Sequence, residues 1–368
     1  MRRSDVAKWI SVALCSALAA TACGTDQAAP ESERLPVPED IECPPGSIAG
    51  AGSSAQELAM QVWTAGYQSE CTDSTIYYDA IGSGGGRSQF IDGAALFAGS
   101  DDALADGERD EAVQRCDGSA PLNLPVYVVP IAVVFNLEGV DELNLSPETI
   151  ASIFNQDITH WDDPEIADDN PELDLPDIPI QSVSRSDESG TTKNFTAYLE
   201  TAASATWPHS SDGQFPIAPV EAGQGNSGVA QAVEAGNGTI GYVEGSHIGE
   251  MDTANVGVGE DFVPPDPAAA AEVLETSERS ATDHEHDHAL DLDYGTTAEG
   301  TYPIVLATYE IVCSEYDDPE EAELLQAFLD YTVSDEGQQA VSDEVGSAPL
   351  PEDMRADLRQ AIASVEAR

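Results

Sequence analysis

The sequence predicts an α/β protein built on a parallel sheet, and three observations support this prediction. Short apolar segments alternate with segments of helical periodicity over the first third of the chain. A loop rich in Gly and Ser follows several of the apolar segments, as is typical of the ends of parallel strands. Hydrophobic residues make up 41% of the 368 residues, which disfavours a disordered chain and suffices for a sizeable core and about two domains.

The first third of the chain holds five expected elements. Leu58, Val62 and Ala65 share one face of the first helix, and runs of Ser and Gly interrupt the pattern after the first two strands. In chain order we expect a strand at 47–50, a helix at 55–68, a strand at 76–81, a helix start at 87–92 and a strand at 95–98.

The central and C-terminal parts continue the same alternation. The apolar run at 126–135 is too short to cross a membrane and predicts a buried strand. Ser146 as N-cap and Pro147 at the first helical position predict a helix at 146–155. The remaining expected elements are a loop at 162–179, a strand at 180–184, helices at 190–199 and 228–235, a strand at 238–243, a poorly ordered stretch at 252–300, a strand at 304–312, and helices at 318–332 and 352–366.

The charge of the chain excludes two classes of partner. Asp and Glu number 69 against 13 Lys and Arg, which gives a formal net charge of −56. A nucleic-acid binder and a polybasic membrane binder both need a basic face that so few cations cannot supply.

The acids are spread along the whole chain and only Lys8 and Lys193 are lysines, which favours a halophilic or haloalkaliphilic host; a merely acidic secreted protein is the alternative.

Residues 1–22 predict an export signal. A basic start precedes an apolar stretch, and small residues lead up to Cys23. This arrangement resembles a bacterial lipoprotein signal, in which Cys23 is lipidated and becomes the mature N-terminus; an ordinary cleaved signal is the alternative. Residues 23–43 are mostly polar and lack apolar periodicity, so we expect a flexible tether to the outer face of the cell membrane.

Four further cysteines would lie in a compartment that permits disulfides: Cys43, Cys71, Cys116 and Cys313. Four cysteines allow three pairings. We favour Cys43 with Cys71, which brackets the first strand and helix, and Cys116 with Cys313 as a long-range bridge. A zinc site is the alternative, although no two of these cysteines form a CxxC pair.

Three loops at strand ends combine Gly with Ser or Thr, at 50–54, 82–86 and 186–192. Each precedes or opens an expected helix, whose first-turn amides lack intrahelical partners and lie at the positive end of the helix dipole. Such loops favour anions, although a single one is equally an ordinary Gly turn. None matches the ATP-binding or dinucleotide-binding Gly patterns. Arg185 directly precedes the third loop, where its guanidinium can bind an oxyanion bidentately; a surface ion pair is the alternative.

These loops carry a family resemblance. The segments GAGSSAQ (50–56), YYDAIGSGGGRSQFIDG (77–93) and RSDESGTTKNFTAYL (185–199), with GQGNSGVAQAV (223–233) and GTIGYVEG (238–245), occur in the order seen in the periplasmic phosphate-binding protein of the phosphate-specific ABC transporter. The resemblance covers about residues 48–248 and 302–350.

The resemblance implies a two-lobed, type II-like periplasmic-binding-protein fold that closes on its ligand, with two hinge crossings near 126–129 and 302–304. On this basis we assign 44–127 and 303–368 to lobe I, and 128–302 to lobe II, with an acidic insertion at about 252–300.

The resemblance also implies a buried phosphate held without metal or cofactor, by Ser54, Ala55, Ser83, Asp101, Arg185, Ser189, Gly190 and Thr191. Asp101 matches the family's carboxylate acceptor. Because an ionised carboxylate only accepts hydrogen bonds, it suits phosphate, which keeps a proton near neutral pH, and opposes sulfate. This sequence departs from the family at Ala55, where a bulky residue is common, and at Glu188, where Gly is usual. We expect the extra carboxylate of Glu188 to weaken anion binding unless it points to solvent.

The implied function is a substrate-binding protein, and not an enzyme, that delivers phosphate to ABC permease subunits. We expect a monomer attached to the membrane by its N-terminal lipid. The alternatives are a receptor for sulfate or molybdate, a secreted phosphatase, and a phosphate sensor. Three His residues within 284–288 offer a divalent-metal pattern, but we prefer a solvated acidic loop there and assign no metal.

The charge leads to a prediction about salt. Repulsion among the excess carboxylates acts over about 30 Å at 0.01 M salt and over about 3 Å at 1 M. We expect the thermal unfolding midpoint to rise between these two conditions. A midpoint that stays constant in a thermal melt followed by circular dichroism would contradict the salt-adapted interpretation.

Overall fold

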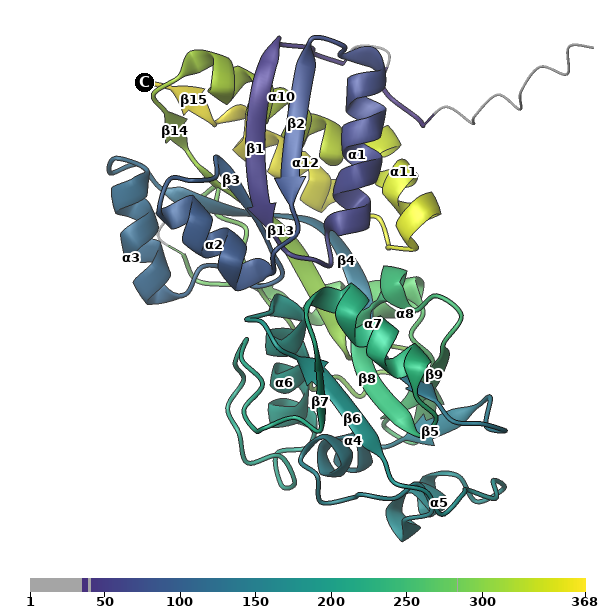
Figure 1. Cartoon of the computed structure of the whole chain (residues 1–368). Coiled ribbons are helices and arrows are strands. Elements are labelled where there is room, and N and C mark those ends of the chain that lie inside the picture. The colour runs from purple at the N-terminus through teal and green to yellow at the C-terminus, as the bar shows by residue number, and fades with distance from the viewer. Residues whose placement is uncertain (1–34, 39–40, 283) are drawn as a thin grey trace, which may run out of the picture. The chain divides into compact units, whose positions relative to one another are not determined.

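The computed structural model describes residues 35–38, 41–282 and 284–368, and Leu35–Arg368 form one compact unit (Figure 1). The predicted signal at 1–22 and the lipidation site Cys23 lie outside the described residues, as does most of the tether. Within the described part of the chain, no helix has the length and hydrophobicity that a membrane crossing requires.

One eleven-stranded sheet runs through the molecule in the order β2-β1-β3-β13-β4-β8-β6-β7, with β9, β5 and β10 attached beside β4. The strands are β1 (Gly46–Gly52), β2 (Ser74–Asp79), β3 (Phe97–Ser100), β4 (Pro121–Asn136), β5 (Leu143–Leu145), β6 (Gln181–Arg185), β7 (Glu221–Gly223), β8 (Thr239–Glu244), β9 (Asp252–Val258), β10 (Asp261–Val263) and β13 (Val305–Cys313). The strands pair in parallel at both ends of the path, as predicted, but β3, β13, β4 and β8 pair antiparallel in its centre.

Strand β4 joins the two halves of the sheet. Its residues from Pro121 to Pro130 pair with β13, and those from Ile131 to Asn136 pair with β8. The side chains along it are almost all buried, which agrees with the apolar run seen in the sequence. In Figure 1, β4 and β13 pass between a half that holds β1, β2 and β3 and a half that holds β6, β7 and β8. We call these halves lobe I and lobe II; the residue boundaries assigned to them above stay predictions.

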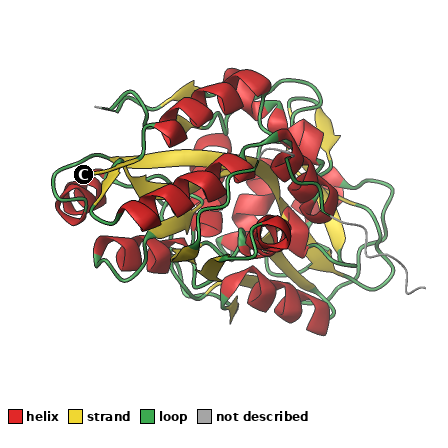
Figure 2. Cartoon of the chain, turned by 90° about the horizontal axis from the view of Figure 1, so that it is seen from above, coloured by secondary structure: helices red, strands yellow, loops and turns green. Residues whose placement is uncertain are grey.

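Helices flank the sheet, as the view in Figure 2 shows. Lobe I carries α1 (Glu57–Glu70), α2 (Ser83–Ile91), α3 (Asp106–Arg115), α10 (Pro319–Thr332), α11 (Asp335–Val345) and α12 (Glu352–Ala363). The rest of the chain carries α4 (Pro147–Phe154), α5 (Pro164–Asp169), α6 (Gly190–Ala202), α7 (Gly225–Ala235), the 3-10 turn η1 (Gly245–His247), α8 (Pro267–Ala271) and α9 (Val273–Thr276). Two short strand pairs complete the set, formed by β11 (Glu278–Arg279) with β12 (Leu290–Asp291) and by β14 (Glu315–Tyr316) with β15 (Glu366–Ala367).

Helix α2 begins four residues before the helix start expected at 87–92. The Gly run that we expected to be a loop forms its first turn, after Gly82 at a φ of 95°. Packing explains why a glycine-rich turn is helical here. A Cβ on Gly86 would come within 2.3 Å of the Gly52 Cα, so only glycine lets α2 approach β1 this closely. Tertiary packing therefore overrides the low helix propensity of glycine.

Other elements escaped the sequence analysis for identifiable reasons. Helix α3 buries only Ala112, so it has no apolar stripe to recognise. The stretch 252–300 is more ordered than expected, because β9 buries Ala254, Val256 and Val258 in alternation and pairs with three strands. Helices α5 and α11 were also missed.

The tract at 284–288 also differs from the solvated loop that we expected. Asp287 is 1% exposed and accepts hydrogen bonds from the backbone and side-chain amides of Asn123 at 3.0 and 2.9 Å. It also pairs with Arg109 of α3. Among the described residues no group of three His, Cys, Asp or Glu side chains is placed to hold a metal ion.

Both favoured disulfides are present. Cys43 is bonded to Cys71 and Cys116 to Cys313, with Cα atoms 5.0 and 5.5 Å apart. The first bond closes a separation of 28 residues and ties the start of the described chain to the end of α1. The second closes a separation of 197 residues and ties the end of α3 to the end of β13.

We expect the long-range bond to stabilise the fold more than the local one. In the chain-entropy model, loops of these lengths contribute about 5 and about 4 kcal/mol, because the longer loop restricts the unfolded chain more. The double replacement Cys116→Ala/Cys313→Ala should therefore lower the free energy of unfolding in urea more than Cys43→Ala/Cys71→Ala does. The reverse order would contradict this account.

Candidate functional site

The three Gly- and Ser-rich loops meet at the junction of the two lobes. All eight residues predicted to hold a ligand are buried. Ser54 follows β1, and its hydroxyl accepts hydrogen bonds from the backbone and side-chain amides of Asn226, both at 3.2 Å. The same Asn226 amide reaches Thr191 Oγ1 at 3.4 Å. Gly190 lies against lobe I so closely that a Cβ there would come within 2.6 Å of the Asp101 Cβ.

Asp101 lies at the centre of the lobe I side. Its Oδ2 accepts from the hydroxyls of Ser53 at 2.7 Å and Ser83 at 3.2 Å, and its Oδ1 accepts from Thr308 at 2.9 Å. Burial raises the pKa of Asp101, and these hydroxyls together with the charge of Arg185 oppose that increase. An ionised carboxylate has about four acceptor positions, so these three bonds leave one on Oδ1.

The serines around Asp101 are already engaged with protein groups. Ser83 Oγ donates to Asp101 and also accepts from the Asp101 amide at 3.2 Å. As the first residue of α2, Ser83 keeps a backbone amide that has no intrahelical partner. The Ala55 amide, which we expected to face the ligand, donates to Ser53 Oγ at 3.0 Å.

Arg185 ends β6 and is the cation of the lobe II side. Its Nε donates to Asp187 Oδ1 at 2.9 Å, its Nη2 pairs with the other oxygen of Asp187, and its Nη1 reaches Thr191 Oγ1 at 3.4 Å. Burial raises the pKa of Asp187, but the hydrogen bonds and charge of Arg185 outweigh it and leave that pKa below its usual value. Asp187 thus holds the guanidinium in one orientation and balances its charge.

The N-terminus of α6 completes the site. Ser189 is the N-cap and accepts from the Thr192 amide at 3.2 Å, so the amides of Gly190 and Thr191 in the first turn are left without intrahelical partners. One turn further along α6, Asn194 donates from its side chain to the Asp101 carbonyl oxygen at 2.6 Å. Amides, hydroxyls and one guanidinium therefore surround an acceptor, an arrangement that suits an oxyanion still carrying a proton.

Sequence reasoning missed several residues of this site: Ser53, Asp187, Asn194, Asn226 and Thr308. Ser53, Asp187, Asn194 and Asn226 all lie within the segments quoted for the family resemblance and could have been singled out from them. Asn226 lies 172 residues from Ser54, and Thr308 lies 207 residues from Asp101, so nothing local in the sequence links either pair.

A second buried acid lies behind the site on β13. Glu310 pairs in register with Gly99 of β3 and is 0% exposed. Neither of its carboxylate oxygens has a hydrogen-bond partner within the described part of the chain. Burial raises the pKa of Glu310 to about 8, so the carboxyl is neutral below that pH.

Comparison with protein-family models matches residues 24–336 to the PBP superfamily domain. Among curated proteins, the phosphate-binding protein PstS2 of Mycobacterium bovis is 36% identical over 365 residues, which cover 97% of each chain. PstS 3 of Mycobacterium leprae is 37% identical over 326 residues, which cover 87% of each chain.

Among solved structures, the high-affinity periplasmic phosphate-binding protein PfluDING, bound with phosphate, aligns with a TM-score of 0.72. The alignment covers 86% of this chain and 93% of that one, at 22% identity. This likeness confirms the predicted two-lobed α/β fold.

The buried Glu310 leads to a prediction about pH. The unfolded chain releases this proton near pH 4.5, and the folded chain near pH 8. Its contribution to stability is therefore fully present below about pH 4.5 and is lost as the pH rises towards 8. Relative to wild type, Glu310→Gln should gain free energy of unfolding between pH 5 and 8, as measured by urea titrations. The exposed Glu323→Gln is the control; a difference for Glu310→Gln that stays flat with pH would contradict the assignment.

Proposed function

Because the chain belongs to the PstS phosphate-binding proteins of the PBP superfamily, we propose that it captures inorganic phosphate between its two lobes and delivers it to an ABC permease. It acts outside the cytoplasm as a binding protein and not as an enzyme. Seven of its eight predicted ligand residues offer groups to the anion, whereas the Ala55 amide donates to Ser53 and so supports the first loop.

The free acceptor position on Asp101 is the observation that carries this proposal. Asp101 lies close to Gly190 at the start of α6, and the charge of Arg185 acts on its carboxylate, so a bound anion there would meet donors as well as this acceptor. Phosphate near neutral pH supplies the proton that this acceptor needs. Near neutral pH sulfate and molybdate carry no proton. The Asp101 carboxylate would then face the bound anion without a hydrogen bond to offset the repulsion of the two charges.

The donors left for phosphate differ in part from those first expected. The backbone amides of Ser83, Gly190 and Thr191 lie at helix N-termini, and the Ser54 hydroxyl keeps its proton for donation because it accepts from Asn226. Asp187 balances the charge of Arg185, so phosphate is bound mostly by dipoles at short range. The net charge of −56 opposes phosphate only at long range, where salt screens it.

A phosphatase on the same scaffold is disfavoured by the state of the serines. Ser83 is bonded to Asp101 and Ser189 caps α6. Within the described ranges neither serine is paired with a histidine that would activate it as a nucleophile.

We also propose the membrane arrangement predicted from the N-terminus. Lipidation of Cys23 anchors the protein to the outer face of the cell membrane, and residues 23–43 act as the tether. The anchored protein works as a monomer with lobe I formed by 44–127 and 303–368. Mass spectrometry of the membrane fraction tests the lipid on Cys23.

A binding titration tests the function. We expect calorimetry of phosphate-free protein to give tight binding of phosphate and none of sulfate. Asp101→Asn should weaken phosphate binding by about 10- to 100-fold, because it removes a hydrogen bond to a charged acceptor, and should reduce the discrimination against sulfate.

Asp330→Asn, which removes an exposed carboxylate of α10, is the control and should leave both affinities unchanged. Tight sulfate binding by the wild type, or an Asp101→Asn variant that discriminates as well as the wild type, would overturn the assignment to phosphate.

A further inference from the structure

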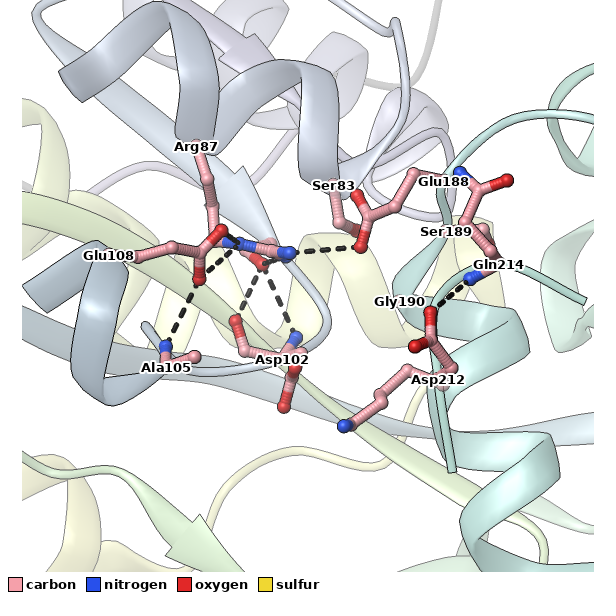
Figure 3. Close-up of polar contacts among 12 residues, drawn as sticks. Ser83, Arg87, Asp102, Ala105, Glu108, Glu188, Ser189, Gly190, Asp212 and Gln214 are labelled. Carbon is pink, nitrogen blue, oxygen red and sulfur yellow. Dashed lines mark hydrogen bonds and ion pairs between the residues drawn. The ribbon is translucent and has the colours of Figure 1, made fainter. Parts of the chain in front are cut away.

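Glu188 occupies an unexpected place in the anion-binding loop. It directly precedes Ser189 on lobe II, and the sequence suggested that its charge would oppose a bound anion unless it faced solvent. Its side chain is 32% exposed and points to lobe I, where Oε1 pairs with Nη2 of Arg87 at 3.0 Å (Figure 3). The charge of Glu188 is therefore partly neutralised by an arginine of the opposite lobe.

Arg87 is held in position by lobe I itself. Its Nε donates to both oxygens of Glu108 at 2.9 and 3.1 Å, and its Nη1 donates to Ser100 Oγ at 3.0 Å. The guanidinium lies between Glu108 and Glu188 in Figure 3, and its side chain is only 6% exposed. With three of its hydrogen bonds made inside lobe I, Arg87 needs little further ordering to receive Glu188 from lobe II.

Two glycines make room for the Glu188 carboxylate. A Cβ on Gly84 would lie 1.2 Å from Glu188 Oε2, and a Cβ on Gly213 would lie 2.3 Å from Oε1. Gly84 is in the first turn of α2, so Oε2 lies at the positive end of that helix dipole. Oε2 itself is buried and has no hydrogen-bond partner among the described residues, so the dipole and Arg87 offset the cost of burying it.

We propose that the Arg87–Glu188 ion pair is a latch between the lobes, which holds the loaded site closed and slows the release of phosphate. The inference rests on the proposed function and adds to it a pair of positioning residues that do not touch the ligand. The pair joins α2, whose first residue contacts Asp101, to the loop that carries Ser189. Closing the lobes forms the pair, and opening them breaks it.

The latch and simple electrostatics predict opposite effects of Glu188→Gln. If the carboxylate acted mainly on the anion, removing its charge would tighten phosphate binding. If it acts through Arg87, the variant should release phosphate about three- to tenfold faster, as expected for a partly exposed ion pair, with an unchanged association rate. Stopped-flow displacement and calorimetry with inorganic phosphate measure both rates and the affinity.

Asp335→Asn is the matched control, because it removes the carboxylate partner of Arg355 within lobe I. It should leave the release rate unchanged. Phosphate binding by Glu188→Gln that is as tight as or tighter than that of the wild type would overturn the latch and leave the proposed function intact. An equal acceleration of release in Asp335→Asn would also overturn it.

A measurement without ligand separates the two proposals. If the wild type binds no phosphate, the proposed function fails, and the radius of gyration from small-angle X-ray scattering then decides on the latch. A larger radius for Glu188→Gln than for the wild type supports a pair that closes the lobes, and equal radii overturn it.

Discussion

The buried carboxylate of Asp101 is the constraint on which the arrangement of the site depends. A charged group at 3% exposure requires compensation, and it receives three hydroxyl donors from the loop after β1, the start of α2 and strand β13. Those donors hold the first two glycine-rich loops in one place. The second lobe then meets the first at the same residue, through Gly190 and through the bond from Asn194 to the Asp101 backbone.

The same rule of local compensation explains how so acidic a chain can bind an anion. Several of its few arginines pair with acids in or near the interior: Arg185 with Asp187, Arg109 with Asp287, and Arg87 with Glu108 and Glu188. Glu310 is compensated differently, since burial keeps it protonated. The negative charge of the chain as a whole therefore describes its exposed surface, whereas the potential at the site is set by nearby groups.

Much of the fold could be predicted, because most elements carry a local signal. The cap Ser146 accepts from the Thr149 amide as expected at the start of α4, and the apolar run in β4 is a buried strand. Helix α3 could not be found, since it buries a single side chain, and the helical character of the Gly run in α2 depends on its contact with β1. The antiparallel centre of the sheet depends on β13, which returns from the far end of the chain to lie beside β3 and β4.

By itself, the sequence determined where anion-binding loops lie, because glycine, hydroxyl side chains and a following helix are local properties. It also pointed to Asp101 and Arg185 as the charged pair of the site, through family resemblance. Only the tertiary structure decided which residues of the different loops contact one another. Asn226 bridges Ser54 and Thr191, and Arg87 pairs with Glu188, which lies 101 residues away in the chain. The physical reason is that hydrogen bonding and charge compensation in the interior depend on distance in space, which chain separation does not specify.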